Sequence, residues 1–181
     1  MSERCTSAPQ PAAHNVFFAI RPPQDIRARI AEATASLPVG GRPLRPGRLH
    51  ISTLNLVHED IVPPGLGEEA AEAAASVRYE PFEVRFDRLV AGAKSMLLLP
   101  SNPLEELRMF RERLGFTLIR SGLPFTMERR FNPHITLLYG NALTFETAIE
   151  PIRWTVDDFV LIDSHIGKTK HVELGRWTLQ S

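Results

Sequence analysis

LHISTLNLV, residues 49–57, is an apolar segment in which a histidine stands two residues before a hydroxyl side chain, and HITLLYG, residues 134–140, repeats this arrangement. Side chains alternate between the two faces of a strand, so the histidine and the hydroxyl project to one side while the isoleucine between them points away. The two segments therefore predict two strands that each present an imidazole beside a hydroxyl. The paired residues are His50 with Ser52 and His134 with Thr136.

The sequence around these two segments also repeats. Residues 16–20 (VFFAI) and 95–99 (SMLLL) are short apolar runs, and each is followed by prolines and by a pattern typical of an amphipathic helix. The inner faces of these two helices are Ile26, Ile30, Ala33 and Leu37, and then Leu107, Phe110, Leu114 and Leu118. Each half continues with the histidine-bearing strand, a helix and a strand, the later helices being expected over residues 67–77 and near residues 145–149. We infer an internal duplication with halves of approximately residues 15–93 and 94–181, which share a core with a cleft between them.

Length and charge narrow the class of protein. The 181 residues suit a single domain, expected over residues 15–181 after a polar, proline-containing leader at residues 1–14 that we expect to be flexible. Twenty-one basic residues balance 21 acidic ones, so no general attraction for a long polyanion exists. Cys5 is the single cysteine, which excludes a disulfide framework. The chain has no stretch long enough to span a membrane, and we expect a cytoplasmic monomer.

The repeated pairs carry the chemistry that the sequence predicts. If a pseudo-two-fold axis relates the halves, His50 and His134 face each other across the cleft, where one neutral imidazole accepts a proton while the other, charged, donates one. Ser52 and Thr136 then donate hydrogen bonds to phosphate oxygens. Imidazoles buried without function would be costly to desolvate, which favours the catalytic interpretation over a structural one. The pattern indicates displacement at phosphorus without a metal.

The other histidines do not form a recognisable metal motif. His14 lies in the leader, His58 ends a strand, and His165 and His171 flank a turn, with none of the short spacings typical of zinc ligands. We therefore expect no metal centre and no cofactor. No glycine-rich phosphate loop is present either, so ATP-driven ligation has no support.

Several segments together resemble one family. FFAIRPP at residues 17–23, NPHITLL at 132–138, FVLIDSHIG at 159–167 and VELGRWTL at 172–179, with the two histidine strands, are similar to the 2H phosphoesterase superfamily. The branch that they most resemble is the bacterial 2′-5′ RNA ligase type, also described as RNA 2′,3′-cyclic phosphodiesterase. The resemblance implies an α+β, bilobal fold with two antiparallel sheets lining a central cleft and helices outside.

The resemblance also implies roles for individual residues. His50 would donate a proton to the leaving ribose oxygen and His134 would activate water, with Ser52 and Thr136 on the phosphate. Arg129 fits the family's R-x-F-x-P-H approach to the second strand, and either it or Arg130 would bind a terminal phosphate; a solvated basic loop is the alternative.

Two positions depart from the family pattern. Thr53 stands where an aliphatic residue is common, on the strand face opposite His50, and should affect packing rather than catalysis. Tyr139 occupies a place where many relatives carry arginine, which removes a phosphate or nucleotide contact.

The expected function is hydrolysis of an RNA terminal 2′,3′-cyclic phosphate to a 2′-phosphate, with reversible 2′-5′ ligation. One alternative is the same chemistry on a small nucleotide, such as a cyclic nucleotide or ADP-ribose cyclic phosphate. Another is an RNA- or nucleotide-binding module without turnover. The expected partners are accordingly RNA ends or small cyclic-phosphate nucleotides.

Overall fold

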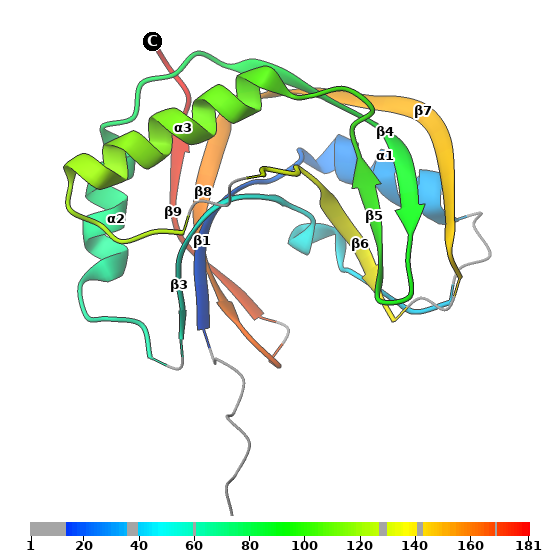
Figure 1. Cartoon of the computed structure of the whole chain (residues 1–181), viewed down its shortest axis with the longest axis horizontal. Coiled ribbons are helices and arrows are strands. Elements are labelled where there is room, and N and C mark those ends of the chain that lie inside the picture. Colours follow the sequence, from blue (N-terminus) through cyan, green and yellow to red (C-terminus); the bar gives the residue numbers. More distant parts are fainter. Residues whose placement is uncertain (1–13, 36–39, 60, 127–129, 141–142, 169) are drawn as a thin grey trace, which may run out of the picture.

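The arrangement of the elements is shown in Figure 1, a computed structural model of the chain. It describes residues 14–35, 40–59, 61–126, 130–140, 143–168 and 170–181. The expected leader lies outside these residues except for His14, which opens the first strand. Leu37, expected on the inner face of the first helix, also lies outside them.

The elements follow the predicted order closely. They are β1 (His14–Ile20), α1 (Gln24–Ala35), β2 (Arg42–Pro43), the 3-10 helix η1 (Pro46–Arg48), β3 (Ile51–Glu59), α2 (Leu66–Ala75), β4 (Phe82–Ala91), β5 (Ser95–Leu99), α3 (Glu105–Arg120), β6 (Ile135–Tyr139), β7 (Phe145–Val156), β8 (Asp158–His165) and β9 (Lys170–Thr178). No helix among the described residues is long and apolar enough to cross a membrane.

The strands form one sheet. Among the described residues it has nine strands in the order β7-β4-β5-β6-β3-β1-β8-β9, with the short β2 paired to β6, and their pairings are antiparallel. The expectation of two sheets is corrected, because β3 and β6 join the two groups of strands through the pair Ile51 and Ile135. This junction follows directly after the two predicted histidines.

The sheet is symmetric about the junction of β3 and β6. Reading outward, β1 lies next to β3 and β5 lies next to β6, and each of these outer strands is the one that precedes a helix along the chain. The helices contact strands other than the one that precedes them: α1 contacts β7, while α3 contacts β3, β4 and α2 (Figure 1). Each side of the molecule therefore contains elements from both halves of the sequence.

The second half lacks the helix expected near residues 145–149. These residues begin β7, which pairs with β4 along its length from Phe145 opposite Ala91 to Val156 opposite Phe82. The sequence FETAIEPIRWTV alternates in burial with a period of two, and it is rich in β-branched and aromatic residues, which suit a strand. Residues 145–149 alone are too short a segment for the helical period and the strand period to be distinguished.

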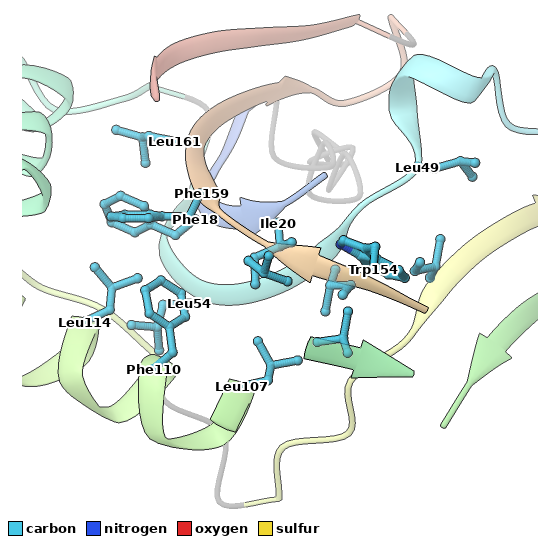
Figure 2. Close-up of a cluster of buried hydrophobic side chains, with 14 of the residues drawn as sticks. Phe18, Ile20, Leu49, Leu54, Leu107, Phe110, Leu114, Trp154, Phe159 and Leu161 are labelled. Carbon is cyan, nitrogen blue, oxygen red and sulfur yellow. The ribbon is translucent and has the colours of Figure 1, made fainter. Parts of the chain in front are cut away.

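The main core lies between α3 and the strands β1, β3 and β8. Figure 2 shows Leu107, Phe110 and Leu114 of α3 directed toward side chains of these strands. The ring of Phe110 lies 5.1 Å from that of Phe159, centroid to centroid. A second cluster of Phe17, Ala19, Val160 and Ile162 covers the opposite face of β1 and β8. Both faces of β1 are therefore buried, which explains its continuous apolar run.

Candidate active site

The two predicted histidines and both hydroxyls line one pocket of about 230 Å³. The antiparallel pair Ile51 and Ile135 sets the register between the two strand starts, which places His50 across from Thr136 and Ser52 across from His134. The other lining residues come from β1, β8, β9, η1 and the ends of β6 and β2: Asn15, Phe17, Leu44, Arg48, Tyr139, Ser164 and His171. The pocket thus gathers residues from both halves of the chain.

Both histidines are held in the same way. Nδ1 of His50 donates a hydrogen bond of 2.7 Å to the carbonyl of Arg48, and Nδ1 of His134 donates one of 2.9 Å to the carbonyl of Asn132. A carbonyl only accepts, so the proton of the neutral imidazole resides on Nδ1 in each case. Nε2 of each ring is left as the nitrogen that exchanges protons with a ligand. This equivalence of backbone contacts is independent of the sequence motif.

His50 is neutral in the free pocket. Its pKa is lowered to about 4, chiefly by burial and in addition by the charges of Arg21, Arg48 and His134, while the hydrogen bond to the Arg48 carbonyl opposes these effects. The ring of Phe17 lies 5.1 Å from that of His50, which supplies the apolar surface. A bound anion would oppose the arginine charges and raise the pKa. The effect of His134 on the pKa of His50 also indicates that the two imidazoles interact electrostatically.

Arg48 and His171 form a pair that the sequence did not reveal. Nη2 of Arg48 donates to Nε2 of His171 over 2.9 Å, and the His171 ring stands edge-on to His50 at 5.4 Å. Burial and the positive charge of Arg48 lower the pKa of His171 to about 4, so His171 accepts as a neutral ring. The side chain of Arg48 is thereby fixed at the pocket, while its carbonyl orients His50.

The pocket is built for an anion. Among the described residues that line it there is no carboxylate, whereas Arg48 contributes a positive charge. Three lining residues also hold buried polar atoms without a hydrogen-bond partner in the described part of the chain: Oδ1 of Asn15, Nε of Arg48 and Nδ1 of His171. Buried polar atoms are rarely left unpaired in native proteins, so such a group of them indicates a place where a ligand or water completes the bonds.

A second pocket of about 280 Å³ adjoins the first. The two share Leu44, Arg48 and Tyr139, and the second adds Arg42, Pro43 and Arg45. Tyr139 is half exposed at 49% and paired to Arg42 across β2 and β6. The aromatic ring and the guanidinium groups are the equipment for stacking a base and holding a neighbouring phosphate.

The predicted site residues fall into three groups. His50, Ser52, His134 and Thr136 meet in the pocket as expected. Arg130 is exposed in a bend and does not line the pocket, whereas Arg129 lies outside the described residues. Thr53 points to the opposite face of β3, where its hydroxyl donates a hydrogen bond to the carbonyl of Phe18, so its contact holds the fold together and lies outside the pocket.

Sequence reasoning missed Arg48, Asn15, Ser164 and His171. The one available signal was for Arg48, which precedes His50 by two residues. The others come from strands far away along the chain.

The comparisons with known proteins identify the family and the fold. The family model of the 2'-5' RNA ligase superfamily matches residues 22–168. The chain belongs to this superfamily. A search of curated proteins found no match. The crystal structure of E. coli LigT in apo form is similar with a TM-score of 0.75 and 25% identity, covering 94% of this chain and 99% of that one.

Two further structures extend the comparison. E. coli LigT complexed with 3'-AMP has a TM-score of 0.73 and 25% identity over 94% of this chain and 99% of its own. The protein TT0787 of Thermus thermophilus has a TM-score of 0.70 over 92% of this chain and 98% of its own, at 20% identity, and shows the shared fold. The antiparallel α+β fold of this 2'-5' RNA ligase superfamily member is therefore that of LigT-like structures.

Proposed function

We propose that this protein is a phosphoesterase that hydrolyses the terminal 2′,3′-cyclic phosphate of RNA to a 2′-phosphate without a metal. The observation that carries the proposal is the equivalent placement of His50 and His134, each oriented by a backbone carbonyl with Nε2 free, in a pocket whose described lining has an arginine and no carboxylate. Two such imidazoles supply one proton acceptor and one donor to a reaction at an anionic phosphorus.

The proposed reaction keeps its protons in balance. Nε2 of His134 takes a proton from water, the water oxygen bonds to phosphorus, and the bond from phosphorus to O3′ breaks. Nε2 of His50 gives its proton to O3′, and Ser52 and Thr136 donate hydrogen bonds to the phosphate oxygens as their charge grows. A 5′-hydroxyl in the place of water gives a 2′-5′ linkage, and the same steps in reverse cleave that linkage.

The proposed donor must receive its proton when the substrate binds. His50 is neutral at pH 7 in the free pocket because of its lowered pKa. The negative charge of the phosphodiester opposes the charges of Arg21 and Arg48 and so raises the pKa of His50, which favours its protonated form. The substrate thereby helps to set the protonation state that its own cleavage requires.

The adjoining pocket favours an RNA end over a free mononucleotide. Arg42 and Arg45 lie beyond Arg48, outside the pocket that holds the two histidines, and Tyr139 stands between the two pockets. A cyclic mononucleotide fills the first pocket, whereas an RNA end places its preceding nucleotide and phosphate against the second. A small nucleotide such as ADP-ribose cyclic phosphate, with its additional phosphates, is the second candidate that this basic extension accommodates.

The first prediction concerns the product. With EDTA present, an oligonucleotide that ends in a 2′,3′-cyclic phosphate is expected to give exclusively a 2′-phosphate, because the proposed donor protonates O3′. Phosphorus NMR or nuclease mapping of the product distinguishes the two phosphomonoesters, and cyclic mononucleotides assayed in parallel rank the substrates. A 3′-phosphate product would show that the leaving oxygen is O2′ and not O3′. Loss of activity on chelation would contradict the metal-free mechanism. Tight binding of the oligonucleotide without turnover would favour the binding module.

The second prediction concerns Arg48. Arg48→Met keeps the carbonyl that orients His50 and removes the positive charge, so KM for the cyclic-phosphate oligonucleotide is expected to rise roughly 10- to 100-fold, as for a lost hydrogen bond to a charged group. The matched control is Arg29→Met, which removes an exposed arginine outside both pockets and should change KM much less. Equal effects of the two variants would show that only the general positive charge matters.

A further inference from the structure

A cluster of metal-ligating side chains lies outside the pocket described above. Nδ1 of His14 is 2.9 and 3.0 Å from the two carboxylate oxygens of Asp163, and Nε2 of His165 is 3.1 Å from Oδ2 of the same carboxylate. The rings of His14 and His165 are 4.6 Å apart between centroids. The cluster joins the first described residue of the chain to the end of β8, a separation along the sequence that no local motif encodes.

We propose that His14, Asp163 and His165 form a binding site for a divalent transition metal ion of the zinc type, held by two imidazole nitrogens, one carboxylate oxygen and a water molecule. The ligand atoms of the three residues all lie within 4.8 Å of one another. Imidazole with carboxylate is a donor set that Zn²⁺ prefers, whereas Mg²⁺ and Ca²⁺ prefer oxygen ligands. The site therefore selects a transition metal over these ions.

The spacing of the donors suits a tetrahedral ion. Zinc bonds of about 2.0–2.2 Å to nitrogen and oxygen place neighbouring donors roughly 3.3 Å apart. Both imidazoles already stand near that distance from the carboxylate. Only the separation between the two imidazoles has to close. On binding, the ion takes the place of the protons that lie between each imidazole ring and the Asp163 carboxylate.

The cluster is accessible to an ion and to water. The side chains of His14, Asp163 and His165 are exposed by 28%, 13% and 22% respectively, so each is partly covered but none is sealed. This exposure leaves room for a water molecule as the fourth ligand.

The site lies on the face of the sheet opposite the pocket. His14 pairs with His165 and Val16 pairs with Asp163, so these residues share one face of β1 and β8. Asn15 and Ser164, which pair with each other between them, project to the other face and line the pocket. An ion at the cluster would therefore tie together the two strand ends behind the pocket and would act on stability rather than on the reacting phosphate.

The test is titration of the full chain, first stripped with a chelator, with Zn²⁺ and with Co²⁺. Zinc at about a hundredfold excess over its dissociation constant is expected to raise Tm by roughly 5–10 °C. Binding to the native state alone stabilises it, and this is the shift in Tm that such stabilisation causes in a protein of this size. Calorimetry should give one ion per chain. Co²⁺ should produce absorption bands of a tetrahedral site, which report coordination directly.

Variants separate this site from other histidines. His14→Ala, His165→Ala and Asp163→Asn should each abolish the shift in Tm and the Co²⁺ bands, whereas His58→Ala, which removes an exposed histidine outside the cluster, should keep both. If Asp163→Asn does not fold, the two histidine variants and the Co²⁺ spectrum of the unaltered chain still show whether the ion binds at the cluster. Unaltered binding in the cluster variants, or no shift in Tm of the unaltered chain at millimolar Zn²⁺, would overturn the proposal.

Discussion

Replacing either His50 or His134 by alanine is expected to lower kcat by about 10²- to 10⁴-fold, because each replacement removes one half of the proposed acid-base pair. The two losses should not add in the double variant, since residues that act in one proton-transfer unit fail together. Single-turnover kinetics on a cyclic-phosphate oligonucleotide, at saturating substrate, measures the chemical step itself.

The control for this prediction is the fold and the binding of substrate. Both rings are oriented by backbone carbonyls. Within the described part of the chain, alanine at position 134 removes no hydrogen bond or ring contact with another side chain, and alanine at position 50 removes only ring contacts with Phe17 and His171. Circular dichroism and the affinity for the product should therefore remain close to those of the unaltered chain. Near-native kcat in either variant would contradict the two-histidine mechanism.

The meeting of the two histidines in one pocket was predictable from the sequence because the signal is local and repeated. Each strand is a short apolar run whose side-chain period is two, so the face shared by His50 and Ser52 follows from their spacing alone, and repetition at His134 and Thr136 separates the pattern from chance. The helices α1 and α3 were predictable for a similar reason, since their apolar residues recur at the helical period along one face.

The features that were not predicted from the sequence depend on contacts between distant segments of the chain. His171 contacts Arg48 across 123 positions of the chain, and His14 contacts Asp163 across 149. Spacing rules for metal ligands and catalytic groups act within a few residues, so they do not detect either pair. Residues 145–149, the start of β7, were expected to be helical because the strand that stabilises them, β4, lies far away in the sequence.

The second large effect is expected on stability as the pH falls. The folded protein holds His50 with a pKa of about 4, whereas an exposed histidine in the unfolded chain titrates near 6.5. Between these values the unfolded state binds the additional proton, so the free energy of unfolding falls as the pH falls through this window. The contribution of His50 is fully present above pH 6.5 and is lost by pH 4, and its size is about 3 kcal/mol at 1.36 kcal/mol for each pKa unit.

Urea unfolding of the unaltered chain and of His50→Gln at pH 7 and at pH 4.5 measures this effect. The quantity compared between the two proteins is the change in the free energy of unfolding from pH 7 to pH 4.5. Carboxylates also titrate at low pH, but they do so in both proteins, so the comparison isolates the histidine. The variant should lose less stability on acidification than the unaltered chain by roughly 2–3 kcal/mol, whereas His58→Gln, at an exposed position, should behave like the unaltered chain. Identical pH dependence in all three would mean that His50 is not desolvated in the folded state, and the pocket would then lack the apolar, positively charged surroundings on which its preference for an anion rests.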